Sequence, residues 1–237
     1  MKKIIGILGG MGPEATAHMH ELIIKKTKVE KDQDHISMVI LNNPKIHPRS
    51  DAIFGIGPDP TPQLIDGVRL LLQAGADFII MPCVTAHYFH PGMAADMDFP
   101  FIRLLDESAL WMKRHLPDVT KAGLLCSTGT LDSRIFHDAF ARFGISVIGP
   151  DKEGQERFEH AVMGPDGIKA GFTSGPPRES VLESAVRLID RGAQAVVAGC
   201  TEIPLVLDPK DISVPLIDPM EIIAEASIRA AGYEVKE

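Results

Sequence analysis

The stretch Gly75-Ala-Asp-Phe-Ile-Ile-Met-Pro-Cys-Val-Thr85 is matched, 117 residues later, by Gly192-Ala-Gln-Ala-Val-Val-Ala-Gly-Cys-Thr-Glu202. Each copy runs from a glycine through an apolar segment to a cysteine. The same offset carries Gly6 onto Gly123. Self-similarity at a fixed period is the signature of a repeated structural unit. The chain is therefore predicted to contain one fold twice, with one thiol from each half.

Length and charge bound what the chain can be. Its 237 residues allow one large domain or two small ones, and the internal repeat favours two. Hydrophobic residues make up 45% of the chain, which is enough for real cores. A net charge of −8 argues against a nucleic-acid surface, which needs a basic stripe. It does not exclude a small acidic substrate, because a few cations at the site are enough to bind one whatever the net charge of the chain.

Cysteine usage and hydropathy indicate a cytoplasmic setting. Three cysteines form no paired framework, which favours a reduced environment. The apolar residues near the N-terminus form a short, glycine-rich run followed by Pro13 and Glu14, so they predict a buried first strand rather than a signal peptide. No apolar run approaches the length that spans a membrane, and no membrane partner is expected.

Short apolar runs alternate with helical patterns along the whole chain. Strands are predicted at 3–8, 37–41, 78–81, 100–104, 121–125, 145–148, 195–198 and 214–217, and helices at 14–28, 61–74, 107–115, 132–143, 179–191 and 219–231. Residues 42–62 and 165–177 are rich in glycine, proline and polar residues and are predicted to be loops. Fully apolar strands alternating with helices indicate parallel sheets covered on both faces. We expect two pseudo-symmetric three-layer α/β/α domains.

Cys83 and Cys200 follow strands in both halves, and ligands of such folds bind beyond the carboxyl ends of the strands. Free cysteines are often merely buried, but here each comes just after its apolar run, beside Thr85 or Thr201. Two thiols across a cleft suit proton transfer on both faces of one carbon, so catalysis is favoured. Cys126 aligns with a glycine under the offset and is expected to be structural.

Zinc is an alternative for the first thiol. Cys83, His87 and His90 could chelate a metal ion, but a His-x-x-His pair with one cysteine is a weak pattern. We therefore predict no metal.

The glycine-rich segment 6–16 follows a strand and opens a helix. It lacks the G-x-G-x-x-G order, and the next strand does not end in the acidic residue that a ribose needs. Two interpretations remain open. The turn exposes main-chain N–H groups to a small anion such as a carboxylate, or its glycines serve close packing only.

Two cations fall in the predicted loops. Arg49 and Lys169 are either solvated surface charges or holders of substrate carboxylates, to which arginine offers a matching fork. Glu202, after Cys200 and Thr201, could orient the main chain, hold a substrate amine or cap a helix.

Six motifs resemble the aspartate/glutamate racemase family, and within it the aspartate racemases. They are GGMGPEAT at 9–16, NNP at 42–44 with Arg49, MPCVTAH at 81–87, LLCSTGT at 124–130, IKAG at 168–171 and GCTEIP at 199–204. The resemblance covers nearly the whole chain. Glu202 looks like the aspartate branch, since glutamate racemases usually have histidine there.

The resemblance implies two pseudo-symmetric domains with the active site in the cleft between them. Their expected bounds are 1–112 with 210–237, and 113–209. It also implies racemisation without a cofactor, with Cys83 and Cys200 as the two acid–base groups. Substrate contacts are implied at Arg49, Val84, Thr85, Ala86 and Lys169, and we also expect them at Met11, Thr128, Thr201 and Glu202. The partner is expected to be an amino acid, and the assembly a homodimer.

Two positions depart from the family. Val84 stands where relatives usually have asparagine, and His47-Pro48 stands where they often have Pro-Asp. Both cysteines are present despite these departures, so the departures affect the expected identity of the substrate and not the proton chemistry. Hydantoin racemisation, maleate isomerisation and decarboxylation of a malonate are sister chemistries on a similar fold. Single-thiol decarboxylases would lack one of the two cysteines, so the intact pair argues against them. A two-lobed binding protein without catalysis is the alternative from another class.

Overall fold

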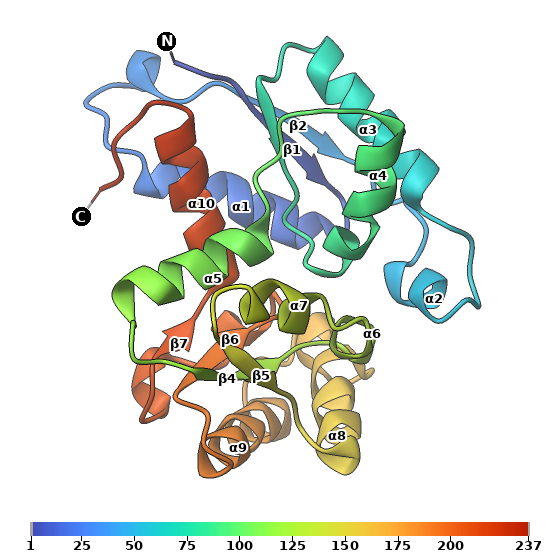
Figure 1. The fold of residues 1–237 in the computed structure, drawn as a ribbon, viewed down its shortest axis with the longest axis vertical. Helices are drawn as coiled ribbons and strands as arrows, with labels where there is room; N and C mark the ends of the chain where they lie inside the picture. The colour runs from blue at the N-terminus through green and yellow to red at the C-terminus, as the bar shows by residue number, and fades with distance from the viewer. Residues whose placement is uncertain (1, 237) are drawn as a thin grey trace. The chain divides into compact units, whose positions relative to one another are not determined.

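The computed structural model describes residues 2–236 and has two compact units. The first comprises the described residues of Met1–Glu107 and Met220–Glu237, and the second comprises Ser108–Pro219. Each unit has its own parallel sheet with helices packed around it (Figure 1). The predicted α/β class with two parallel sheets is confirmed. Within residues 2–236, no helix is long and apolar enough to cross a membrane.

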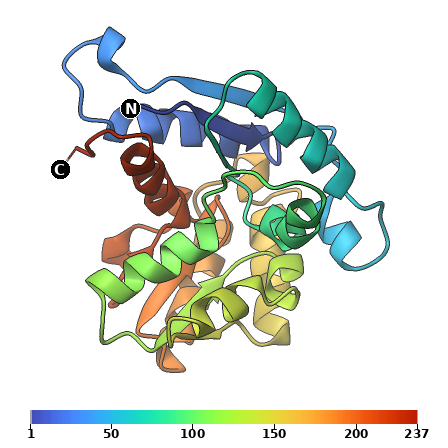
Figure 2. The same cartoon turned by 45° about the horizontal axis from the view of Figure 1, so that its top comes forward.

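The first sheet has the strand order β2-β1-β3. Its strands are β1 (Ile5–Gly9), β2 (Met38–Asn42) and β3 (Phe78–Ile80), and all pair in parallel. Strands β1 and β3 are buried throughout, as apolar runs in a covered sheet must be. Figures 1 and 2 show α1 (Pro13–Lys26) and α3 (Thr61–Gln73) flanking these strands. The unit also contains α2 (Arg49–Ile53), α4 (His90–Asp96), α10 (Pro219–Ala230) and the 3-10 turns η1 (Asp32–Asp34) and η2 (Thr85–Phe89).

The second sheet has the order β5-β4-β6-β7. Its strands are β4 (Lys121–Leu125), β5 (Ser146–Ile148), β6 (Ala195–Ala198) and β7 (Leu216–Ile217). The first three strands of each unit therefore share one order, with the second strand, then the first, then the third. The helices are α6 (Thr128–Asp132), α7 (Ile135–Ala141), α8 (Lys152–Met163) and α9 (Pro176–Asp190), and α5 (Leu104–His115) leads in from the first unit. Three further 3-10 turns are η3 (Ile168–Ala170), η4 (Ile203–Leu205) and η5 (Pro209–Asp211).

The turn before the third strand is the same in both units. Gly75 and Gly192 have φ values of +94° and +89°, which a side chain rarely adopts. The residue after each glycine donates its N–H to the helix that precedes it. This hydrogen bond joins Ala76 to Leu71 and Ala193 to Leu188, at 3.0 Å in both units. The repeat in the sequence is thus a repeat in the backbone.

Two expectations for the first half are wrong in detail. Residues 42–62 are not all loop, because Arg49–Ile53 forms α2. Pro48 precedes it, Asp51 lies in its first turn, and Gly55 follows its end with a φ of +71°. The strand predicted at 100–104 is a single bridge between Ile79 and Phe101, because the next helix begins at Leu104.

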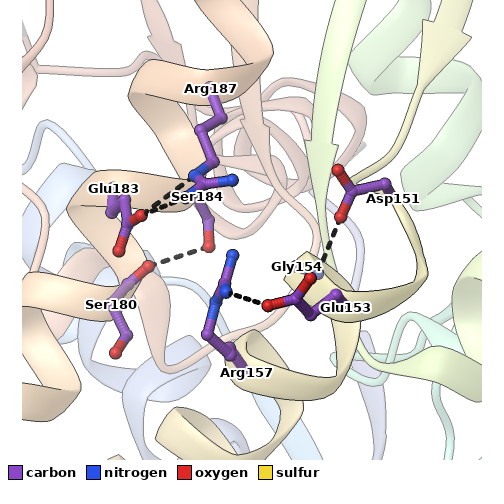
Figure 3. Close-up of polar contacts among 8 residues, drawn as sticks. All are labelled: Asp151, Glu153, Gly154, Arg157, Ser180, Glu183, Ser184 and Arg187. Carbon is purple, nitrogen blue, oxygen red and sulfur yellow. Dashed lines mark hydrogen bonds and ion pairs between the residues drawn. The ribbon is translucent and has the colours of Figure 1, made fainter.

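The second half also differs from expectation at its helices. The helix predicted at 132–143 is two helices, α6 and α7, separated at Arg134, whose φ of 58° is left-handed. Helix α8 has no counterpart in the sequence analysis. Asp151 caps it by accepting the Gly154 N–H at 2.8 Å, and Arg157 pairs with Glu153 one turn away (Figure 3). Its buried face contributes Phe158 to the core of the second unit.

His87 fixes the end of β3. Its ring is 1% exposed, and Nε2 lies 3.1 Å from the carbonyl oxygen of Met81, two residues before Cys83. Burial lowers the pKa of His87 from 6.5 to about 3, Arg103 and His90 add to the lowering, and the Met81 hydrogen bond opposes it. The folded state therefore holds this ring neutral.

We expect this neutral ring to make the protein acid-sensitive. The unfolded chain protonates His87 below about pH 6.5, and the folded chain does so only near pH 3. The stability from this residue is therefore present above pH 6.5 and falls by about 1.4 kcal/mol per pH unit below it. Urea titrations of the native protein and of His87→Gln at several pH values measure this slope. His160→Gln, at an exposed histidine, is the control, and equal slopes in the native protein and His87→Gln would contradict the assignment.

Candidate active site

Cys83 and Cys200 occupy equivalent positions in the two units. Each follows the third strand of its sheet, is 8% exposed and precedes a single 3-10 turn, η2 or η4. The carbonyl oxygen of Cys83 accepts the N–H of Ala86, and that of Cys200 accepts the N–H of Ile203, both at 3.2 Å. All three cysteines are free thiols. The two halves thus present a thiol at the carboxyl edge of each sheet in the same local geometry.

Arg49 ties its segment to the turn after β1. Its Nη1 donates to the carbonyl oxygens of Ile46 and His47 at 3.1 and 2.9 Å, and its Nη2 donates to that of Met11 at 3.4 Å. Its Nε is buried without a hydrogen-bond partner. Helix α2 also packs against η2, which follows Cys83. Arg49 and Met11 therefore lie together at the edge of the sheet that carries Cys83.

The three residues after Cys83 differ in what they expose. Val84 is buried at 6%, and Thr85 is half-buried. Ala86 is fully buried, and its N–H is bound to Cys83. The side chain of Ala86 is thus buried and its N–H is already hydrogen-bonded. Val84 and Thr85 are the better candidates for substrate contacts at this edge.

The glycine turn after β1 uses one of its own donors. The N–H of Gly10 donates to Oγ1 of buried Thr16 at 2.8 Å, and Thr16 in turn donates to the carbonyl oxygen of Gly12 at 3.0 Å. A side chain on Gly10, whose φ is +95°, would overlap the main chain of Asn43. Close packing therefore accounts for this glycine, and its N–H is not available to an anion.

Glu202 contacts three of the predicted residues of the second unit. Its Oε2 lies 2.8 Å from Sγ of Cys200 and 3.1 Å from Oγ1 of Thr201. Its Oε1 lies 3.4 Å from Nζ of Lys169. The Glu202 side chain is 17% exposed. One largely buried carboxylate therefore joins a thiol, a hydroxyl and a cation at this edge.

These surroundings raise the pKa of the second thiol. Burial raises the pKa of Cys200 well above its usual value, and the charge and hydrogen bond of Glu202 raise it further. Lys169 opposes the rise. On balance these surroundings favour the thiol form of Cys200 over the thiolate.

Thr128 lies at the end of the neighbouring strand, β4, with two residues that the sequence analysis missed. Oε2 of Glu159 accepts both the N–H of Thr128 at 2.9 Å and its hydroxyl at 3.2 Å. Nε2 of Gln155 donates to the carbonyl oxygen of Cys126 at 2.9 Å, while its Oε1 is buried without a partner. Both residues belong to α8, so its cap at Asp151 was the signal that could have found them. Thr128 is thus bonded to α8, apart from the group around Glu202.

Cys126 is fully buried beside Gly199. Burial raises the pKa of its thiol well above the usual value, and Glu159 and Asp132 add to the rise. This agrees with the structural role expected of it.

Other candidate sites are poorer. Among residues 2–236, no group of three histidine, cysteine, aspartate or glutamate side chains is arranged to hold a metal ion, and His87 is bound to Met81. A cavity of about 360 Å³ beside α8 and the start of α9 is lined by none of the predicted residues. Within its lining, Arg157 pairs with Glu153, and His160 lies 3.3 Å from Asp166. The two thiol-bearing edges are the better candidates.

The chain is similar in sequence and fold to known racemases. The family description Asp/Glu/Hydantoin racemase matches residues 8–227. The broad specificity amino-acid racemase of Bacillus subtilis (strain 168) is 24% identical over 232 residues, which are 95% of this chain and 96% of that protein. The Picrophilus torridus aspartate racemase has a TM-score of 0.83 and 29% identity, covering 99% of this chain and 96% of its own. An aspartate racemase homologue from Pyrococcus horikoshii OT3 shares the fold at a TM-score of 0.79 and 24% identity, covering 98% and 99%. The chain therefore belongs to the Asp/Glu/hydantoin racemase family.

Proposed function

We propose that this chain racemises amino acids without a cofactor, using Cys83 and Cys200 as acid–base groups on opposite faces of the α-carbon. The observation that supports this best is the equivalent place of the two thiols in two equivalent sheets. Family membership supports a racemase, which is an isomerase. In this proposal, as in the sequence-based prediction, both thiols act on one substrate.

The proposed reaction moves two protons and no other group. The thiolate of one cysteine takes the α-proton and becomes a thiol, and the electron pair left on the carbon spreads into the carboxylate. The thiol of the other cysteine then gives its proton to the opposite face and becomes the thiolate. General acid–base groups contribute typically about 10²- to 10⁴-fold each. Exclusion of water keeps the donor's proton from being lost.

The proposed substrates are acidic amino acids, together with a broader range of other amino acids. Arg49 and Lys169 are the cations proposed for their carboxylates, with Met11, Val84, Thr85, Thr128 and Thr201 as further contacts. Two observations support breadth. Val84 offers only apolar contact, and the Bacillus subtilis relative is described as a broad specificity amino-acid racemase. The homodimer and the cytoplasmic setting stay predictions.

We expect Cys83→Ala and Cys200→Ala each to lower racemisation by about 10³-fold or more, because each removes one of two required proton carriers. Entry of solvent deuterium at the α-carbon, followed by NMR in D₂O over a panel of amino acids, measures the loss. The panel includes a hydantoin, because the family name covers hydantoin racemases.

Cys126→Ala is the matched control, since Cys126 is a buried thiol of the second unit. It should keep most of the activity, and circular dichroism should show all three variants folded. Full racemisation by either of the first two variants would rule out the two-base mechanism. Binding of amino acids without any deuterium entry in the native protein would favour a binding protein.

Val84→Asn should shift the preference toward aspartate. An amide can donate to and accept from the polar groups of a substrate, and hydrogen bonding discriminates more sharply than apolar fit. We expect the kcat/KM ratio of aspartate over a less polar amino acid to rise about tenfold, the effect of about one added hydrogen bond. Val84→Thr, which keeps the shape and adds one hydroxyl, is the control. A ratio that falls or stays constant in Val84→Asn would show that this position does not set specificity.

A further inference from the structure

Both oxygens of the Glu202 carboxylate are occupied inside the second unit. Oε2 lies 2.8 Å from Sγ of Cys200 and 3.1 Å from Oγ1 of Thr201, and Oε1 lies 3.4 Å from Nζ of Lys169. These three contacts use most of the roughly four acceptor sites of a carboxylate. In this structure Glu202 therefore serves its neighbours within the second unit.

The contact with Cys200 bears on where the proton lies. An ionised carboxylate only accepts hydrogen bonds, so a 2.8 Å contact with ionised Glu202 calls for a hydrogen on the sulfur. A thiolate at the same distance would face a like charge in a largely buried setting. The contact therefore favours the thiol over the thiolate and gives the S–H bond a direction.

We propose that Glu202 is a positioning residue that holds Cys200 as an oriented thiol, so that in the resting enzyme Cys200 is the proton donor. This rests on the proposed two-base racemisation. The complementary role of base in the first half-reaction then belongs to Cys83.

The remaining neighbours of Cys200 in the second unit agree with this role. Glu202 on its own segment and Lys169 on η3 are the charged groups that act on its sulfur. The core around it is apolar and includes Phe158, Ile203 and Val206. Burial and the Glu202 carboxylate favour the thiol, whereas Lys169 and the main-chain N–H of Glu202 favour the thiolate. Lys169 therefore reduces the rise in the pKa of Cys200, but the net shift is still upward.

The test follows the titration of Cys200 itself. With Cys83→Ala and Cys126→Ala, Cys200 is the single remaining cysteine of the three. The ultraviolet absorbance of its thiolate is measured against pH, with and without Glu202→Gln. Loss of the carboxylate charge should move the midpoint down by about one pH unit, which is about tenfold more thiolate at a given pH below the midpoint. Coincident midpoints would overturn the proposal.

Two further variants keep the result interpretable. Glu159→Gln removes a carboxylate of the same unit that is bonded to Thr128 and not to Cys200, and its midpoint should stay in place. An equal shift there would mean that any lost charge suffices, which overturns the proposal. If Glu202→Gln does not fold, Glu202→Asp replaces it. The shorter side chain withdraws the carboxylate from the sulfur, so a smaller downward shift is expected and no shift is the contrary result.

The titration does not depend on racemisation. A native protein that leaves the α-proton of every amino acid in place in D₂O would end the proposed function, while the midpoints would still report whether Glu202 holds the Cys200 proton. Conversely, an active racemase with coincident midpoints would keep the function and remove this role of Glu202.

Discussion

The position of each thiol depends on a close approach at a glycine in the middle of the first strand. A side chain on Gly6 would collide with Ala76 and Ile79, and one on Gly123 would crowd Leu188 and Ala193. Without a side chain there, the turn before the third strand packs directly on the first strand. The third strand then enters in register and ends at the carboxyl edge, where its cysteine follows. Gly6 and Gly123 lie 117 residues apart, so the same packing constraint applies once in each half of the sequence.

Strands were predictable because burial on both faces leaves a plain signal. Each central strand is a continuous apolar run, and the observed bounds lie close to those expected from the sequence. Short and polar helices gave no such signal. Helix α2 is one turn within a proline-rich segment, and α8 has the Asp151 cap and one charge pair, Arg157 with Glu153, on its surface. Local hydrogen bonds and ion pairs of this kind leave little signal in the sequence. They are nevertheless enough to stabilise a helix that also packs against the core.

The candidate site was predictable in its residue types and less so in its contacts. The cysteines and the cations follow from the repeat and from the family resemblance. The partners of Glu202 do not, because Lys169 is far from it in the sequence and no periodicity joins the two. The same holds for Gly10, whose N–H is used by Thr16, and for Ala86, which is enclosed in the core. Side-chain contacts of this kind are fixed by packing, which a linear pattern does not contain.

The two halves repeat their backbone but not their electrostatics. Beside Cys200 stands a carboxylate, Glu202, whereas the first half has at its edge the guanidinium of Arg49, bound to main-chain carbonyl oxygens. Such asymmetry is compatible with the proposed racemisation. Two enantiomers have equal free energy in water, so kcat/KM must be equal in both directions whatever the protein does. A bias in the resting proton position can therefore appear only as proportional differences in kcat and KM, so that the enantiomer with the higher kcat also has the higher KM. The repeat places one thiol in each half, and in the proposed mechanism the side chains around Cys200 favour its thiol form at rest.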